Sequence, residues 1–114
     1  MKVADAVGWF LAEHVKHVFC ISGGASLWLI HGIANARKNG KEIQYVCPQH
    51  EQAAGFAADS YARLNGIGCA LATSGPGATN LITAIGASYY DSVPVLYLTG
   101  QVTKARMSPK GTVR

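Results

Sequence analysis

The sequence contains few charged residues and no long apolar run. Charged side chains make up only 14% of the 114 residues, against about 25% in an average soluble domain. We therefore expect an unusual share of the surface to be covered by a partner domain or by another copy of the chain. No apolar run approaches the ~18 residues of a membrane span, and no charged leader precedes an apolar segment. These absences favour a soluble, cytoplasmic protein with no membrane partner.

Cysteine is also scarce. Cys20, Cys47 and Cys69 are odd in number and far apart, which excludes both a CxxC metal site and a disulfide framework. Each lies within or beside a short apolar run, so we expect three buried thiols in a reducing compartment. The four histidines show no ligand spacing either, and we expect no metal site within this chain.

The net charge of +4 comes from the last eleven residues. Up to residue 103 the six basic and six acidic side chains cancel, and the excess is carried by Lys104, Arg106, Lys110 and Arg114. Because no aromatic residues are interleaved with these charges, they are a weak signal for nucleic acid, and we expect no nucleic-acid partner. Residues 104–114 are expected to form a basic tail that is extended or disordered.

Apolar residues follow two alternating patterns along the chain. Helical spacing is found at about 3–16, 27–40, 49–65 and 76–90, and short continuous apolar runs lie between these segments at 18–21, 42–46, 69–72 and 95–98. Continuous runs that alternate with helices are typical of a parallel sheet covered on both faces. We therefore predict one three-layer α/β/α domain over residues 1–103, with about four parallel strands.

Three junctions between an expected strand and the next helix carry special residues. They are Ser22-Gly23-Gly24, Pro48-Gln49-His50-Glu51 and Thr73-Ser74-Gly75-Pro76-Gly77. In a parallel sheet ligands bind beyond the carboxyl ends of the strands, so these junctions are expected to converge. Glycines there leave room for a flat ligand, although ordinary turn chemistry explains them equally well. No Gly-Lys-Ser/Thr sequence follows, which leaves a phosphate-binding loop without support.

Glu51 is the acidic residue at these junctions. A carboxyl group beside strand ends, at the start of an alanine- and glycine-rich helix, is expected to be poorly hydrated and able to share a proton with a ligand. The structural alternative is an acid in the first turn of a helix, where negative charge is favoured. For the adjacent His50 we favour a role in starting the helix over a role in orienting substrate.

Four collinear blocks of the sequence resemble the pyrimidine-binding domain of thiamine-diphosphate enzymes, and in particular the acetolactate synthase group. The resemblance covers about residues 3–103. The blocks are Ile21 to Ser26, His50 to Ala54 with Tyr61-Ala62-Arg63, Thr73 to Asn80, and Asp91 to Pro94 with Thr99 to Val102.

The resemblance implies a function for named residues. Glu51 would hydrogen-bond to the aminopyrimidine ring of thiamine diphosphate and activate the cofactor for attack on a 2-keto acid. Gly23 and Gly24 would lie against that ring, and Pro76 and Asn80 would line its other side. The implied activity is acetolactate synthase-like carboligation or decarboxylation.

The resemblance also implies that this chain is incomplete. In the family the diphosphate and its Mg²⁺ are held by a separate domain with a Gly-Asp-Gly motif, of which this sequence has no trace. That domain belongs to the same or a second subunit, so we expect a homodimer or a higher homo-oligomer. The chain alone is expected to be an inactive fragment. The FAD of some relatives is bound through a middle domain, so this sequence makes no prediction about FAD.

Two other functions are compatible with the residues. The domain could be a non-catalytic scaffold or pairing module of the same fold. It could also be an unrelated flavodoxin-like domain that holds a nucleotide at the same strand ends.

Overall fold

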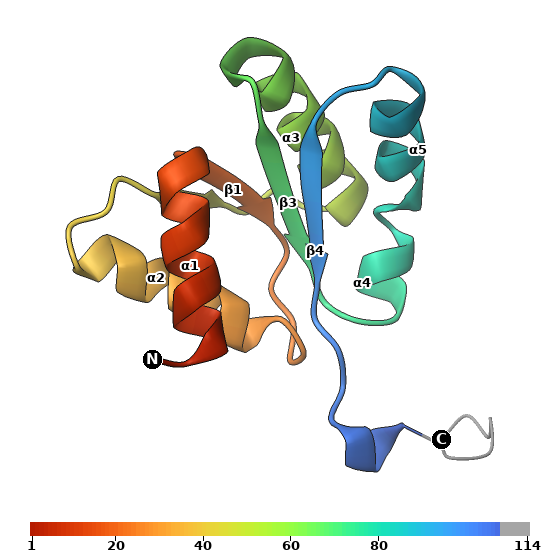
Figure 1. Ribbon diagram of the computed structural model, residues 1–114. Helices are drawn as coiled ribbons and strands as arrows, with labels where there is room; N and C mark the ends of the chain where they lie inside the picture. The colour runs from red at the N-terminus through yellow and green to blue at the C-terminus, as the bar shows by residue number, and fades with distance from the viewer. Residues whose placement is uncertain (108–114) are drawn as a thin grey trace.

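The computed structural model describes residues 1–107 (Figure 1). The elements, in chain order, are α1 (Val3–His14), β1 (His17–Cys20), α2 (Leu27–Lys38), β2 (Gln44–Val46), α3 (Glu51–Asn65), β3 (Gly68–Ala72), α4 (Pro76–Thr79), α5 (Ile82–Tyr90), β4 (Val95–Thr99) and the short 3₁₀ turn η1 (Lys104–Arg106). Most of the basic tail expected at 104–114 lies outside the described residues.

The four strands form one parallel sheet in the order β2-β1-β3-β4. Phe19 of β1 is in register with Val46 of β2 on one side and with Ala70 of β3 on the other. Ala70 is in turn opposite Tyr97 of β4. The prediction of an α/β domain with a parallel sheet of about four strands is confirmed.

Helices cover both faces of the sheet, which gives three layers. In Figure 1, α1 and α2 lie to the left, α4 and α5 lie to the right, and α3 lies behind β3 and β4. Successive residues of β3 face opposite sides, as pleating requires. Cys69 and Leu71 pack with Leu11 of α1 and Ile33 of α2, whereas Ala70 and Ala72 pack with Ala58 of α3 and with Leu81.

The helices approach their neighbours closely because the contact positions are glycine or alanine. Gly55 of α3 faces Ala84 of α5, and Gly68 faces the backbone carbonyl of Ala58; a Cβ on either glycine would collide with that neighbour. Helices α1 and α2 cross in the same way at Gly8 and Gly32. The alanine- and glycine-rich helix α3 therefore lies unusually close to α5 and β3.

The predicted continuous helix from Pro76 to Tyr90 is wrong. The chain forms the short helix α4, turns at Asn80 and Leu81, and continues as α5. The break has a physical cause in the burial of Leu81, which is fully buried in the core on the α3 side of the sheet. The N–H of Leu81 donates to the carbonyl of Ala78 over 3.1 Å, a tight i to i−3 bond that interrupts the regular helix.

One cysteine also differs from expectation. Cys20 and Cys69 are buried, as predicted, but Cys47 is exposed. It follows β2, a three-residue strand at the edge of the sheet whose residues are all exposed. An edge strand has a neighbour on one side only, so the apolar character of its residues does not ensure burial.

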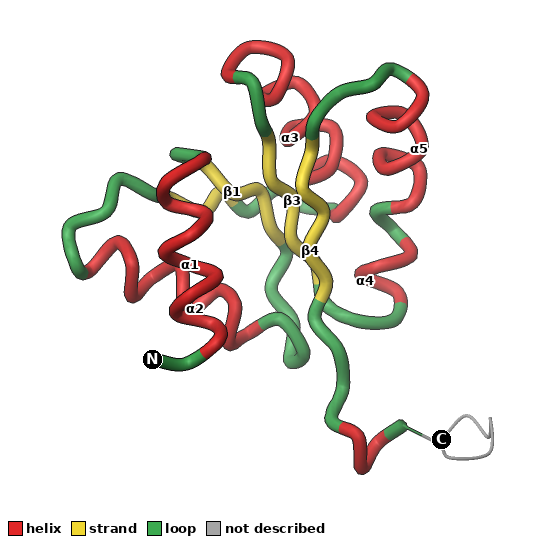
Figure 2. The backbone as a smooth tube through the Cα atoms, viewed as in Figure 1, coloured by secondary structure: helices red, strands yellow, loops and turns green. Residues whose placement is uncertain are grey.

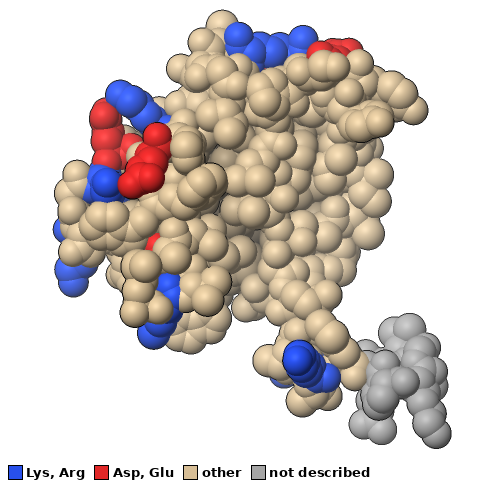
Figure 3. Space-filling view, viewed as in Figure 1, with Lys and Arg blue, Asp and Glu red and all other residues tan. Residues whose placement is uncertain are grey.

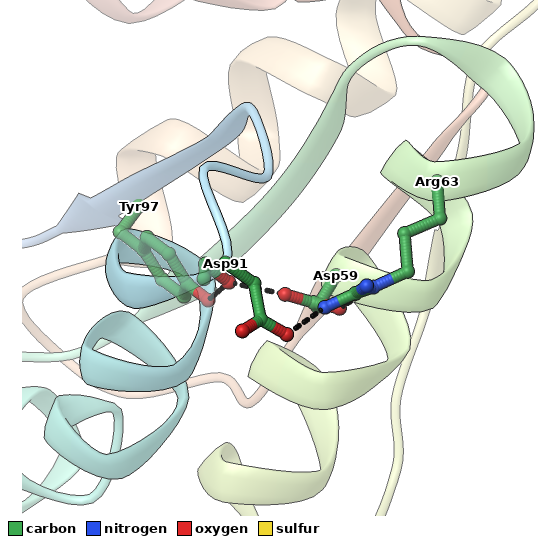
Figure 4. Close-up of polar contacts among 5 residues, drawn as sticks. Asp59, Arg63, Asp91 and Tyr97 are labelled. Carbon is green, nitrogen blue, oxygen red and sulfur yellow. Dashed lines mark hydrogen bonds and ion pairs between the residues drawn. The ribbon is translucent and has the colours of Figure 1, made fainter.

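A polar cluster fastens α5 to α3 and β4 (Figure 4). Asp59 of α3 is 6% exposed and accepts hydrogen bonds from Ser88 Oγ and from Arg63 Nε, each at 2.7 Å. Ser88 Oγ also lies 2.8 Å from the hydroxyl of Tyr97, and Arg63 Nη2 donates to Asp91 at 2.6 Å. The hydrogen bond from Ser88, followed by that from Arg63, lowers the pKa of Asp59.

The helices α4 and α5 carry no charged side chain, since residues 64–90 contain none. In Figure 3 the right-hand side of the molecule is tan, with charged side chains only at its upper and lower ends. Large apolar residues of α5 are nevertheless exposed: Ile82 by 61%, Tyr89 by 79% and Tyr90 by 86%. This surface, called here the α5 face, agrees with the expectation that something covers part of the domain. None of the helices in the described part of the chain is long and apolar enough to cross a membrane.

Candidate functional site

The site lies where the winding of the sheet changes direction. β1 leads outward to β2 at one edge, and the chain then returns through α3 to β3 on the other side of β1. Such a reversal opens a crevice between the loops that follow the two central strands. Figure 2 shows the loops after β1 and β3 side by side at the same end of the sheet, as predicted.

The loop after β1 is held from both sides. The backbone N–H of Ala25 donates to the hydroxyl of Thr73, which follows β3, over 3.3 Å. Gly100, which follows β4, lies so close to Ala25 that a Cβ there would collide with the Ala25 carbonyl. Within the loop, Ser26 is fully buried, and its hydroxyl donates to the carbonyl of Gly23 over 3.1 Å. The loop is thus fixed by its neighbours as well as by its own sequence.

Thr73 connects two of the three junctions. A Cβ on Gly23 would lie 2.5 Å from Thr73 Cβ, and a Cβ on Gly77 would lie 2.8 Å from Thr73 Cγ2. The threonine side chain therefore fills the space that both glycines leave. Gly75, between them, has φ +64°, a conformation that strongly favours glycine. Gly23 and Gly77 are thus required by close packing, and Gly75 is required by a turn.

Glu51 is the first residue of α3, and the residue before it caps the helix. The backbone N–H of Gln52 donates to Nδ1 of His50 over 3.1 Å, and His50 itself has extended backbone angles, as an N-cap residue does. The expected role of His50 in starting the helix is confirmed. The cap fixes the direction from which the Glu51 side chain leaves the helix.

The carboxyl group of Glu51 points toward the third junction. Asn80 Nδ2 donates to Glu51 Oε2 over 3.0 Å. The other oxygen, Oε1, would lie 3.4 Å from a Cβ on Gly77, so it faces a position without a side chain. Within residues 1–107, Oε1 has no hydrogen-bond partner from the chain itself. Glu51 is half-buried, with Oε2 held by Asn80 and with no hydrogen-bond partner for Oε1 among residues 1–107.

A groove of about 570 Å³ lies on the other side of Thr73. It is lined by residues of the loops after β1 and β3 and of the segment after β4: Gly24, Ala25, Trp28, Thr73, Ser74, Gln101, Val102, Thr103 and Arg106. Gly24 has no atom within 4 Å of the position that a Cβ would take, so it leaves the groove open. Glu51 and Asn80 are not among the lining residues.

The five residues predicted from the sequence take four different positions. Glu51 and Asn80 are in direct contact, Gly23 touches them only through Thr73 and Gly77, and Gly24 faces the groove. Pro76 begins α4 with an exposed side chain, and its carbonyl accepts from the N–H of Asn80 over 3.0 Å. Its contribution is therefore to the backbone turn that carries Asn80.

Sequence reasoning missed the roles of Thr73 and Gly77. Both residues belong to the third junction. A threonine directly after a buried strand indicates a contact between loops, because its short side chain reaches the neighbouring loop. Nothing in the sequence shows which loop that is, since the order of the strands is set by the fold.

Comparison with protein families gives a match over almost the whole chain. Residues 1–113 match the family model described as "Thiamine pyrophosphate enzyme, N-terminal TPP binding domain". The chain belongs to this family. The resemblance to the pyrimidine-binding domain of thiamine-diphosphate enzymes is thereby confirmed, and the unrelated flavodoxin-like alternative is excluded.

Curated relatives of this TPP-binding domain are acetolactate synthases. The chain is 49% identical over 94 residues to the acetolactate synthase of Arthrospira platensis. The aligned segment covers 82% of this chain and 16% of the relative. It is 47% identical over 97 residues to the acetolactate synthase large subunit of Cyanidium caldarium, with 83% and 16% covered. A probable acetolactate synthase large subunit of Methanocaldococcus jannaschii is 45% identical over 104 residues, with 90% and 17% covered. The TPP-binding domain described here spans about a sixth of these relatives.

The residues at the site fit the aminopyrimidine part of thiamine pyrophosphate, the same compound as thiamine diphosphate. Such a ring presents nitrogen atoms that can share a proton with a carboxyl group, and Glu51 Oε1, beside Gly77, has no hydrogen-bond partner among residues 1–107. The residues do not fit a metal ion. Among the described residues of the TPP-binding domain, no group of three His, Cys, Asp or Glu side chains is suitably placed for one.

Proposed function

We propose that this chain is the part of an acetolactate synthase-like, thiamine-diphosphate-dependent enzyme that supplies the activating carboxyl group to the aminopyrimidine ring. The observation that carries the proposal is the state of Glu51. Its carboxyl group lies beyond the carboxyl ends of the parallel strands, where ligands bind in such sheets, with Oε2 held by Asn80 and Oε1 next to Gly77. The substrates of the enzyme are proposed to be 2-keto acids, in agreement with the relatives.

In this proposal each residue has one task. Glu51 holds a proton at Oε1 and shares it with a ring nitrogen, which an amide in its place cannot do. Asn80 keeps the carboxyl group from turning away, and His50 fixes the start of α3. Gly23 and Gly77, packed on Thr73, bring two backbone segments to the ring, and Gly24 leaves its face accessible. Pro76 supports the turn of Asn80.

When bound, thiamine diphosphate supplies an electron sink for the carbon of the keto group. We propose that its diphosphate and Mg²⁺ are held by a cofactor-anchoring domain of the same or a second subunit. The uncharged α5 face, with exposed Ile82, Tyr89 and Tyr90, is the surface proposed to contact that second subunit. The partner is thus proposed to be another copy of the same polypeptide.

The test compares Glu51→Gln with a matched control in the complete polypeptide that the gene encodes. Acetolactate formation from pyruvate is measured with added thiamine diphosphate and Mg²⁺. We expect Glu51→Gln to lose more than about 100-fold in kcat, since proton transfer by a positioned side chain contributes about 10²–10⁴. Glu42→Gln, in an exposed ion pair with Lys16, is expected to keep normal activity. Near-normal turnover by Glu51→Gln would falsify the assignment.

A mixing experiment distinguishes a catalytic domain from a scaffold. If the domain is a non-catalytic pairing module, mixing the protein with an active relative yields co-assembly but no activity that depends on Glu51. A shared site instead predicts that this chain restores activity to a relative whose own activating acid has been replaced.

A further inference from the structure

Two cysteines from adjacent strands meet near the site. Cys20 Sγ lies 3.9 Å from Cys47 Sγ, close enough for a weak thiol contact. Cys20 is the last residue of β1, and Cys47 directly follows β2. Each comes one residue after the registered pair Phe19 and Val46. The two cysteines therefore occupy neighbouring positions on parallel strands, with their side chains on the same face of the sheet.

This placement suits a disulfide. Neighbouring strands lie about 4.8 Å apart, and the Cα atoms of a disulfide lie about 4.4–6.8 Å apart. The sulfur atoms are separated by more than a bond length of about 2.05 Å, so they have to move toward each other. Rotation of two side chains that already point at one another brings them closer without any change of strand order.

The two thiols differ in accessibility, and the difference sets their order of reaction. Cys47 is exposed, whereas Cys20 is fully buried in the core between the sheet and α1–α2. Burial, together with the nearby Cys47, raises the pKa of the Cys20 thiol to about 12. Only thiolates react readily with oxidants. Cys47 is thus the thiol that a dissolved oxidant reaches first. Cys20 is the neighbouring thiol that can then react with the oxidised Cys47.

We propose that Cys20 and Cys47 form a reversible disulfide when the protein meets a peroxide. In the first step the Cys47 sulfur bonds to one peroxide oxygen, the O–O bond breaks, and the released hydroxide takes up a proton as water. In the second step the Cys20 sulfur bonds to the Cys47 sulfur, the S–O bond breaks, and the leaving hydroxide takes the Cys20 proton. Two thiols and one hydrogen peroxide give one disulfide and two waters.

The disulfide would join the segments that lead to the site. Cys20 lies three residues before Gly23, and Cys47 lies four residues before Glu51. Drawing the sulfurs together pulls the end of β2 toward the core and shifts the cap at His50. We expect oxidation to lower the activity of the complete enzyme, and a thiol reductant to restore it. This consequence rests on the proposed function, whereas the disulfide itself does not.

The test uses the 114-residue chain and hydrogen peroxide. After treatment, the chain is unfolded, free thiols are alkylated with iodoacetamide, and the intact mass is measured. We expect one alkyl group, on Cys69. Before alkylation, the mass of the treated chain is expected to be lower than that of the reduced chain by two hydrogens. Trypsin cuts after Lys16, Arg37, Lys41 and Arg63, so the linked peptides are expected to be 17–37 and 42–63. If a thiol reductant is added before alkylation, all three cysteines are expected to carry an alkyl group.

Variants decide whether the pair is responsible. Cys47→Ser, at an exposed position, is expected to abolish the link and leave two alkylated thiols. Cys69→Ala is expected to keep the link and leave none. Three alkyl groups on treated wild type would overturn the proposal, as would a link to the Cys69 peptide 64–104 or oxidation of Cys47 without a link. Since this test reads mass alone, its failure is distinct from a failure of the Glu51 assignment.

Discussion

Asn80 donates a hydrogen bond from Nδ2 to Glu51 Oε2 over 3.0 Å, although 29 residues separate the two side chains. Glu51 starts the helix after β2, and Asn80 ends the short helix after β3. The bond therefore joins two successive strand–helix units. The position of the candidate catalytic carboxyl group therefore depends on how α4 and α5 pack against α3.

The first prediction concerns the support given to Glu51. If the proposed function holds, Asn80→Ala is expected to lower kcat of the complete enzyme roughly tenfold or more, because a hydrogen bond to a charged group contributes about 1.5–3 kcal/mol. Steady-state kinetics with saturating cofactor is the measurement. Asn65→Ala removes a bond to the carbonyl of Tyr61 at the exposed end of α3 and is the control. Equal activity of the two variants would exclude a positioning role for Asn80.

A second prediction compares two glycines in helices. In Gly77→Ala the new Cβ lies 2.8 Å from Thr73 Cγ2 and 3.4 Å from Glu51 Oε1, so we expect a loss of about 1–3 kcal/mol in the free energy of unfolding. In Gly86→Ala the Cβ meets no atom within 4 Å, and α5 is expected to gain about 0.5–1 kcal/mol. Urea unfolding of the chain measures both. A stabilising Gly77→Ala would show that Thr73 does not pack as described.

The third prediction concerns acid stability. The hydrogen bond from Ser88, and then the one from Arg63, lower the pKa of Asp59 below its usual value of 3.8. The carboxylate therefore stabilises the fold above that value, and its contribution is lost as the pH falls through the lower, folded-state pKa. Asp59→Asn is expected to be less stable than wild type at neutral pH, with a difference that shrinks on acidification.

Unfolding free energies measured across the acid range decide this. Glu13→Gln serves as the control, because Glu13 is 61% exposed and its nitrogen partner Lys41 Nζ is 3.8 Å away. We expect it to leave the unfolding free energy almost unchanged. A difference between wild type and Asp59→Asn that stays constant down to the most acid pH would contradict a lowered pKa at Asp59.

The fourth prediction concerns the α5 face. Exposed apolar patches without charge mark surfaces that associate. We expect the wild-type chain to sediment above its monomer mass and the double variant Ile82→Lys, Tyr89→Lys to sediment as a monomer. Leu64→Lys, which changes an exposed apolar residue at the end of α3, is the control and is expected to behave as wild type. If the wild-type chain is monomeric over the accessible concentration range, the α5 face is not an association surface of this chain.

Most of the fold could be predicted from local pattern. The continuous apolar run at Cys69–Ala72 becomes the central strand β3, fully buried as such a run requires. Gly66, with φ +92°, ends α3 where the sequence places the end. The break at Asn80 and Leu81 was missed because it depends on what these side chains meet in the folded chain. The helical spacing of apolar residues is the same whether or not the burial of Leu81 interrupts the helix.

The site was predictable to the level of its junctions. Parallel strands bring their carboxyl ends together, so Gly23, Glu51 and Thr73 had to lie near one another. Which residue touches Glu51 was not predictable, because Pro76 and Asn80 both follow β3 within a few residues, and only the turn after α4 directs Asn80 to the carboxyl group. The exposure of Cys47 was likewise hidden, since the sequence does not show that β2 lies at an edge.

Because all four strands are parallel, the chain also has an opposite end, made of the turns that enter the strands. The turns near Gly40, Gly66 and Ser92 lie there. Gly40 and Gly66 have φ angles of +86° and +92°, which favour glycine, so these two residues should be kept. A fluorescent label on the exposed Lys38, at the end of α2 beside Gly40, would report on the domain without entering the loops around Glu51.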